Sequence, residues 1–148
     1  MDFEIIEAQL MKHEGEKLKP YRCSAGKLTI GIGRNLDDNG ISEEESMFLL
    51  DNDIIACSQD LSLLIFPKKF DNFPENIQHV LIDMRFQLGR KGFRSFKKMI
   101  FAFQNFDYPG AIKEMKDSKW YKQTTERANN LIEMVAKEIS NANINTGN

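Results

Sequence analysis

The amino-acid sequence predicts a mostly helical α+β protein, and three observations support this class. Apolar residues recur at helical spacing through most of the chain. One short segment, residues 27–32, instead alternates in the manner of a half-buried strand. The chain has 148 residues, of which 41% are hydrophobic and 28% are charged. These values suit a single compact domain with its own core and exclude a disordered chain.

The first third of the chain is predicted to contain one helix, a β-hairpin and a polar loop. The helix covers residues 3–13, with apolar residues three or four positions apart and a glycine just past its end. The hairpin turns at Ser-Ala-Gly, residues 24–26, between strands at residues 20–23 and 27–32. The Asp-Asp-Asn-Gly stretch at residues 37–40 is either this polar loop or a second turn.

A capping box and an apolar stripe predict one long helix after this loop. Ser42 and Glu45 have the spacing at which each side chain bonds to the backbone N–H of the other residue. The stripe continues for about 20 residues, which corresponds to roughly 30 Å of helix. Its members are Met47, Leu50, Ile54, Cys57, Leu61 and Leu64. An element of this length can join two lobes.

The remainder of the chain is predicted to be helical. Pro67 and Pro74 bracket a linker, and Pro74 suits the start of a helix that stops at Gly89. Asp107 and Thr124 are candidate N-caps for the last two of three further helices. These three helices are predicted at residues 93–104, 109–116 and 126–140.

The two predicted lobes of this single domain differ in charge. The small lobe, with the hairpin, covers about residues 14–60, and the helical lobe covers about residues 1–13 plus 61–148. Residues 1–66 hold 6 basic and 13 acidic side chains, a net charge of −7. Residues 67–148 hold 14 basic and 9 acidic side chains, a net charge of +5. A basic half suggests an anionic partner, and lysines that only solvate helix faces are the alternative.

The composition argues against several classes of protein. Two cysteines cannot form a disulfide framework, so we expect Cys23 and Cys57 to be free thiols. The longest apolar run, residues 99–103, is far shorter than the ~20 residues of a membrane span. The spacing typical of metal ligands does not occur, and we expect no metal and no cofactor. No signal peptide is recognisable at the N-terminus, so we expect synthesis in the cytosol.

Three polar residues near the predicted hairpin are candidates for a catalytic site. Glu14 ends the first helix and precedes a glycine, so its carboxyl can project into open space. Thr29 lies on the strand face opposite Leu28 and Ile30, away from the lobe's core, and Cys23 lies on the partner strand. An acid near two small polar groups suits glycoside hydrolysis, which needs a proton donor and a group that positions water. Isolated residues of these types are common, so the spacing alone is a weak argument.

The same three residues begin a longer pattern. Eight residues separate Glu14 from Cys23, and five separate Cys23 from Thr29. Two further segments follow, IDMRFQLG at residues 82–89 and WYKQTTERA at residues 120–128. Together they resemble the phage-type lysozymes, glycoside hydrolase family 24, whose motif is Glu, eight residues, Asp or Cys, five residues and Thr.

The resemblance implies a two-lobed lysozyme-like fold and an inverting muramidase. Such an enzyme hydrolyses the β-1,4 bond between N-acetylmuramic acid and N-acetylglucosamine in bacterial peptidoglycan. Glu14 matches the general acid, Thr29 the threonine that helps to hold the attacking water, and Arg127 an arginine that pairs with the catalytic glutamate. Four residues match positions that line the saccharide cleft or bond to substrate: Asp83, Gln87, Gln123 and Thr124. The alternatives are a solvated helix face for the first two and an N-cap for the last.

Cys23 departs from the commoner family pattern, in which many members have Asp at this position. A free thiol has a pKa of ~8.5 and is mostly neutral at pH 7. One hypothesis is that nearby Arg22 or Lys27 lowers the pKa of Cys23, so that a thiolate takes part in catalysis. The other is that catalysis rests on Glu14 and Thr29, while Cys23 only fills space.

A second departure is Arg34, which stands where the family often has His. Asp53 matches the aspartate that pairs with that histidine. We therefore predict an ion pair between Arg34 and Asp53, which stays charged until the carboxylate is protonated.

The resemblance favours an endolysin made in the host cytoplasm, which reaches peptidoglycan after a separate protein has permeabilised the membrane. We expect a monomer with no nucleic-acid partner and no stable membrane insertion. The main alternative is a weak or inactive peptidoglycan-binding protein on a lysozyme scaffold. A nucleic-acid-binding module that uses the basic half and a thiol hydrolase with Cys23 as nucleophile are further alternatives.

Overall fold

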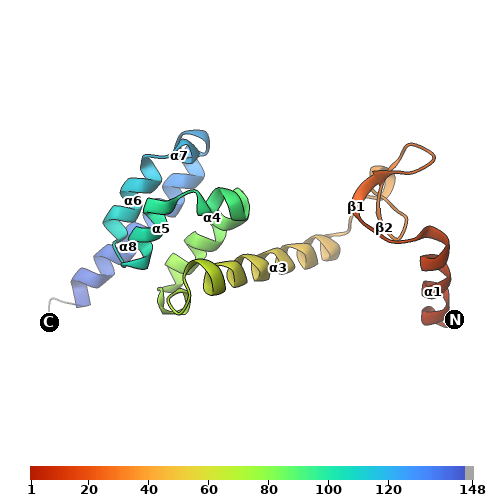
Figure 1. Ribbon diagram of the computed structural model, residues 1–148, viewed down its shortest axis with the longest axis horizontal. Coiled ribbons are helices and arrows are strands. Elements are labelled where there is room, and N and C mark those ends of the chain that lie inside the picture. The colour runs from red at the N-terminus through yellow and green to blue at the C-terminus, as the bar shows by residue number, and fades with distance from the viewer. Residues whose placement is uncertain (146–148) are drawn as a thin grey trace. The chain divides into compact units, whose positions relative to one another are not determined.

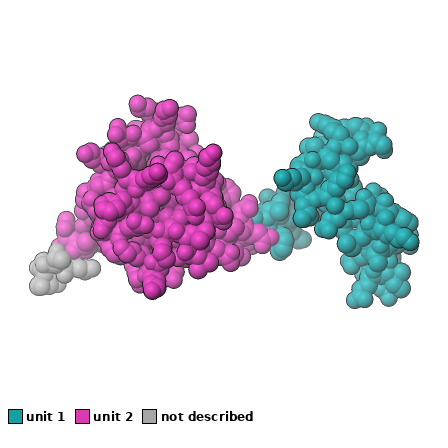
Figure 2. Space-filling view, viewed as in Figure 1, with its two compact units in different colours: residues 1–49 teal, residues 50–148 magenta. Residues whose placement is uncertain are grey.

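The computed structural model describes residues 1–145 of the chain. Within these residues it contains eight α-helices and one three-stranded sheet, which confirms the predicted α+β, mostly helical class (Figure 1). The chain forms two compact units, Met1–Leu49 and Leu50–Asn148 (Figure 2). The division into lobes at residues 14–60 and at residues 1–13 plus 61–148 stays a prediction. None of the helices within residues 1–145 is long and apolar enough to cross a membrane.

The first unit begins with helix α1, Phe3–Glu14. The Asp2 side chain caps this helix by accepting from the N–H of Ile5 at 3.3 Å. Gly15 follows with φ 69°, and its N–H bonds to the carbonyl of Met11 at 2.9 Å. The helix predicted at residues 3–13 is therefore confirmed, with a glycine at its end.

A small antiparallel sheet follows α1, with its strands in the order β1-β2-β3. The strands are β1 (Lys17–Arg22), β2 (Leu28–Gly31) and β3 (Arg34–Asn35). In the β1–β2 turn, the N–H of Cys23 bonds to the carbonyl of Lys27 at 3.0 Å. The N–H of Gly26, a residue with φ 76°, bonds to the carbonyl of Cys23 at 2.8 Å. The predicted hairpin is confirmed, and β3 is an element that the alternation did not indicate.

The segment predicted as a polar loop forms a short helix instead. Helix α2 covers Leu36–Asn39, and the N–H of Gly40 bonds back to the first residue of this helix at 3.0 Å. The Asn35 side chain caps the helix by accepting from the N–H of Asp38 at 3.0 Å. A capping residue with acids in the first turn stabilises even one turn of helix, which explains the difference.

The predicted long helix is present as α3, Glu43–Asp60, followed by a π-helical segment at Leu61–Ile65. The capping box is confirmed: the N–H of Ser42 bonds to Glu45 Oε2 at 2.8 Å, and the N–H of Glu45 bonds to Ser42 Oγ at 3.1 Å. The π-helical segment buries its first and last residues. Leu64, which was predicted to continue the apolar stripe, is 57% exposed because the wider turn changes the helical register.

Helices dominate the second unit. They are α4 (Glu75–Arg94), α5 (Lys97–Gln104), α6 (Tyr108–Lys116), α7 (Lys119–Gln123) and α8 (Thr125–Asn145), with a 3-10 turn at Phe70–Asn72 before them. The predicted stop at Gly89 is a kink with φ 70° and ψ 170°, after which α4 resumes. Helix α7 was not predicted, because five residues are too few to show a period. Helix α8 extends past the predicted end at residue 140.

The hydrophobic core lies in the second unit. Its fully buried side chains include Phe66, Ile77, Leu81, Met84, Phe93 and Phe103. Trp120, 4% exposed, packs edge-on against Phe96 with ring centroids 6.3 Å apart. Asp107 caps α6 as predicted, because its side chain accepts from the N–H of Gly110 at 2.9 Å. Thr124 directly precedes α8, as predicted for an N-cap, and its carbonyl accepts from the N–H of Ala128 at 2.8 Å, while its hydroxyl donates to the carbonyl of Trp120 at 2.9 Å.

Candidate functional site

Glu14 lies against the turn that follows strand β2. A Cβ atom on Gly33 would lie 2.9 Å from Glu14 Oε2 and 3.0 Å from its Cδ. The carboxyl therefore occupies the space that a side chain at Gly33 would need. Gly33 also has φ 69°, which side chains disfavour. Glycine is thus required here both for the turn and for the close approach of Glu14.

Thr29 is the most enclosed part of this candidate site. It is 3% exposed and its hydroxyl donates to the carbonyl of Lys27 at 2.9 Å. Tyr21 of β1 and Asn35 of β3 are its partners on the two sides of the sheet. The expectation that Thr29 faces away from the unit's interior is wrong. The two neighbouring strands and the β1–β2 turn enclose it.

Cys23, the residue that follows β1, is half-buried, and the Thr29 hydroxyl is one of the groups that influence its thiol. The pKa of the Cys23 thiol is lowered, first by the backbone N–H of Lys27 and then by that of Ala25. The Thr29 hydroxyl lowers this pKa further, while partial burial opposes the shift. The structure therefore brings Cys23 and Thr29 together, and the hypothesis of a lowered pKa is supported.

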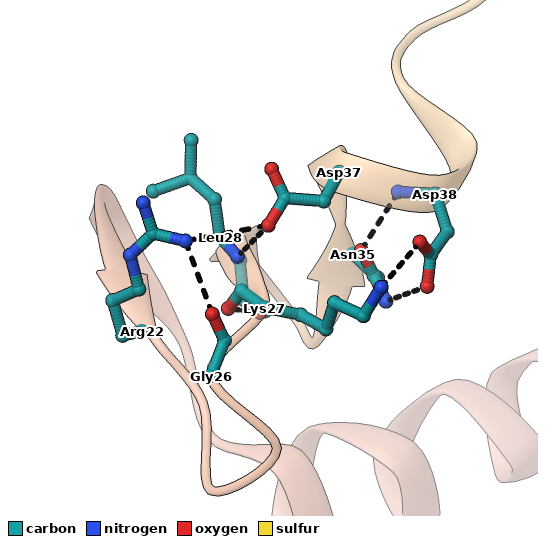
Figure 3. A network of polar contacts seen from close by, with 8 residues as sticks. Arg22, Gly26, Lys27, Leu28, Asn35, Asp37 and Asp38 are labelled. Carbon is teal, nitrogen blue, oxygen red and sulfur yellow. Dashed lines mark hydrogen bonds and ion pairs between the residues drawn. The ribbon is translucent and has the colours of Figure 1, made fainter.

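The charges that were expected to lower the pKa of Cys23 have other partners (Figure 3). Arg22 Nη1 lies 3.4 Å from Asp37 Oδ2, and Lys27 Nζ lies 2.8 Å from Asp38 Oδ1. Asp37 Oδ2 also accepts a hydrogen bond from the backbone N–H of Leu28 at 2.7 Å. These ion pairs join the hairpin to α2. The pKa of the Cys23 thiol is lowered by backbone amides of the turn. The types of the neighbouring residues do not reveal this cause, because every residue of the turn has a backbone.

We expect iodoacetamide to alkylate Cys23 at a lower pH than it alkylates an ordinary thiol, because the thiolate is the nucleophile. Cys57 is the matched control, since it is 4% exposed and burial raises the pKa of its thiol. Peptide mass spectrometry over a range of pH should give a lower midpoint for Cys23 in the native chain than in the unfolded chain. The same midpoint for Cys23 in the native and the unfolded chain would contradict this.

Arg34 forms its ion pair with Glu45, within the first unit. Two parallel bonds join them, Nη1 to Oε2 at 3.0 Å and Nη2 to Oε1 at 2.6 Å. The pKa of Glu45 is lowered, first by the backbone N–H of Ser42 and then by the Arg34 guanidinium. Arg34 thus connects β3 to the first turn of α3. Sequence reasoning assigned Glu45 only a capping role, and the pair between Arg34 and Asp53 stays a prediction.

The second unit holds the other predicted site residues. Arg127 Nε on α8 donates to Asp83 Oδ1 on α4 at 2.7 Å, and both side chains are about 40% exposed. Trp120 Nε1 on α7 donates to Gln87 Oε1 on α4 at 2.8 Å. Asp83 and Gln87 are therefore bonded to other helices, unlike residues on a fully solvated helix face. The pairing of Arg127 with the glutamate Glu14 stays a prediction.

Gln123 and Thr124, at the end of α7, border two pockets of the second unit. The larger pocket, about 570 Å³, is also lined by Trp120, Phe96, Lys97 and Lys98. The smaller, about 500 Å³, includes Thr124 and Arg127. Gln123 is common to both pockets, and its amide can both donate and accept hydrogen bonds. These pockets could accommodate polar groups such as sugar hydroxyls and amides.

The amino-acid sequence is similar to one protein family and to several known proteins. Residues 11–138 match the family model described as phage lysozyme. The chain is 29% identical to "Probable T4-type lysozyme 2" of Dictyostelium discoideum, covering 86% of this chain and 91% of that protein. It is 28% identical to "Probable T4-type lysozyme 1" of the same organism, covering 93% and 96%. It is 29% identical to "Pre-baseplate central spike protein Gp5" of Enterobacteria phage T4, covering 80% of this chain but only 25% of that protein.

Proposed function

Because the chain belongs to the phage lysozyme family, we propose that it is a muramidase that hydrolyses peptidoglycan. The bond cleaved is the β-1,4 bond between N-acetylmuramic acid and N-acetylglucosamine, and the anomeric centre is inverted. The observation that carries this proposal is the Glu14 carboxyl held against Gly33, which follows the strand that contains Thr29. Cys23 lies beside Thr29 and completes the set.

Glu14 supplies the proton in this mechanism. Its side chain is exposed, so a saccharide can approach the carboxyl. A general acid must hold its proton within hydrogen-bonding reach of the oxygen that leaves, and an exposed carboxyl can meet the glycosidic oxygen directly. The proton passes to the glycosidic oxygen as the bond to the anomeric carbon breaks. The carboxylate that remains then stabilises the positive charge developing on the sugar.

Thr29 and Cys23 handle the attacking water. The hydroxyl proton of Thr29 is donated to the carbonyl of Lys27, so the oxygen is available to accept from a water molecule. The lowered pKa of Cys23 increases the fraction of thiolate that can accept the second proton of that water. The water oxygen forms the new bond to the anomeric carbon, and its proton goes to sulfur. A thiolate here takes the role for which many family members have a carboxylate.

The first experiment is an assay on purified peptidoglycan. New reducing ends on N-acetylmuramic acid support the proposal, and proton NMR of the fresh product should show the α-anomer, as inversion of a β bond requires. A chain that sediments with peptidoglycan and releases no reducing ends would instead be a binding protein on a lysozyme scaffold. That outcome would overturn the catalytic assignment of Glu14.

We propose a role in host lysis as well, with release from the host cytoplasm by a separate membrane-permeabilising protein. Family membership supports this proposal. Expression in a bacterial host should leave cells intact until such a permeabilising protein is co-expressed, and lysis should then follow. Absence of lysis in the presence of muramidase activity would contradict the lytic role and leave the enzymatic proposal standing.

The pH profile of a Cys23→Asp variant tests whether the thiolate acts as the base. In the unchanged chain, kcat/KM is expected to fall as the pH drops through the lowered pKa of Cys23, because protonation removes the base. Aspartate has an ordinary pKa of ~3.9, so this acid limb should move to lower pH in the variant. Cys23→Ser should lower kcat at every pH. Unchanged profiles in both variants would show that Cys23 only fills space.

A Gly33→Ala variant is expected to lower kcat/KM by about 10²-fold, because the new methyl group displaces the Glu14 carboxyl. Gly31→Ala is the matched control. Gly31 has φ 66°, close to the 69° of Gly33, so both variants carry similar backbone strain. A Cβ on Gly31 meets no atom within 4 Å. Equal losses of activity in the two variants would mean that strain, and not Glu14, is responsible.

A further inference from the structure

A single buried carboxylate gathers three arginines of α4 in the second unit. Asp60, at the end of α3, has a fully buried side chain. Its Oδ2 lies 2.6 Å from Arg85 Nε and its Oδ1 lies 2.9 Å from Arg90 Nε. Arg94 Nη2 lies farther away, 3.9 Å from the same Oδ1. Three positive charges therefore meet one negative charge.

The local sequence leaves this excess charge uncompensated. Residues 84–106 contain six basic side chains and no acidic one. Lys97 and Lys98, the last two of the six, line a pocket together with Glu114 and Asp117. The arginine cluster, defined as Arg85, Arg90 and Arg94, has Asp60 as its acidic partner among the described residues. The cluster with its carboxylate carries a net charge of +2.

The arginine cluster keeps most of its hydrogen-bond donors available. Arg85 donates to Asp60 through Nε, and Nε is also the atom of Arg90 nearest to Asp60, so within residues 1–145 the Nη atoms of both forks make no hydrogen bond. Asp60 Oδ1 has no well-aligned hydrogen bond despite its short distance to Arg90. The side chains of Arg90 and Arg94 are 59% and 47% exposed, whereas that of Arg85 is 13% exposed. Two guanidinium groups are thus held by a buried carboxylate and accessible to solvent.

We propose that the arginine cluster binds a phosphoryl group, either in free phosphate or in an anionic lipid headgroup. Guanidinium forks match the spacing of phosphate oxygens, and a dianion would balance the net charge of +2. Asp60 positions the arginines, because its buried carboxylate lies 2.9 Å from Arg90 Nε while the Arg90 side chain stays 59% exposed. Arg94, the least tightly held, closes on the second side of the phosphate. This site is separate from the muramidase proposal and does not depend on it.

The test is a titration of the full chain with sodium phosphate, followed by NMR of the arginine Nε–H signals at constant ionic strength set with sodium chloride. The signals of Arg85 and Arg90 are expected to shift and to saturate. Arg94→Gln should raise the Kd at least about fivefold, because one of two forks is lost. Lys91→Gln, which removes an equal charge from the same end of α4, should change it less than about twofold.

Variants and vesicles distinguish the outcomes. Arg94 lies too far from Asp60 for a hydrogen bond, so its replacement leaves the two shorter ion pairs in place and the fold intact. Shifts that do not saturate, or equal losses in Arg94→Gln and Lys91→Gln, would overturn the proposal in favour of diffuse charge. Sedimentation with phosphatidylglycerol vesicles, but not phosphatidylcholine vesicles, would identify a lipid headgroup as the source. Saturation by phosphate without vesicle binding would identify free phosphate.

Discussion

A Glu14→Gln variant is expected to lose at least about 10²-fold in kcat on peptidoglycan, since general acid catalysis contributes ~10²–10⁴-fold. Glutamine keeps the shape of the side chain and its place beside Gly33. Its amide protons are not acidic enough to be transferred to the glycosidic oxygen, so the leaving group would depart as an unprotonated alkoxide. The measurement is the initial rate at which reducing ends form on purified peptidoglycan.

Glu16→Gln is the control for this substitution. Glu16 is an exposed acid two residues farther along the chain, and it lies outside the contact with Gly33. The control should retain activity within about twofold, in line with an exposed charge that makes no contact with the substrate. Both variants should melt at the temperature of the unchanged chain. Activity in Glu14→Gln equal to that of the control would exclude Glu14 as the acid.

An Asp60→Asn variant is expected to lower the free energy of unfolding of the second unit by about 3 kcal/mol, because breaking a buried ion pair leaves charges uncompensated. The Asp60 side chain is fully buried, and Arg85, bonded to it at 2.6 Å, is only 13% exposed. An amide cannot balance the guanidinium charge. The single tryptophan, Trp120, is buried in this unit, so its fluorescence during urea denaturation reports the unfolding of the second unit.

Asp51→Asn is the control for the stability effect. Asp51 is an exposed aspartate on the same helix, so its replacement should change the free energy of unfolding by less than about 0.5 kcal/mol. If Asp60→Asn and Asp51→Asn unfold at the same urea concentration, then Asp60 is not a stabilising element. That result would also contradict the proposal that Asp60 positions the arginine cluster.

The candidate site was only partly accessible to sequence reasoning. The spacing of Glu14, Cys23 and Thr29 identified the residues, and the register of β1 with β2 pairs Thr29 with Tyr21, two positions before Cys23, so the predicted hairpin brings Cys23 and Thr29 into the same part of the sheet. The amides that lower the pKa of Cys23 belong to the backbone of the turn, so the identities of the residues there do not predict the effect. The contact of Glu14 with Gly33 depends on how α1 leads into the sheet. Neither could be derived from spacing.

The sequence alone determined the features that depend on neighbours a few residues apart. The glycine at the end of α1, the capping box of α3 and the Asp107 cap agree with prediction, and the helix predicted to stop at Gly89 is interrupted there by a kink. Each is stabilised by contacts or backbone preferences within about one helical turn, and the residue types needed for them are visible in the chain.

Only the tertiary structure decided which distant side chains meet. Arg34 bonds to Glu45, Trp120 bonds to Gln87, and Asp60 gathers arginines 25 or more positions away along the chain. Many acids and bases in the sequence could have paired, and charge alone does not choose among them, because exposed ion pairs differ little in free energy. Backbone geometry and burial make the choice. They also enclose Thr29, which the strand pattern had assigned to the outside.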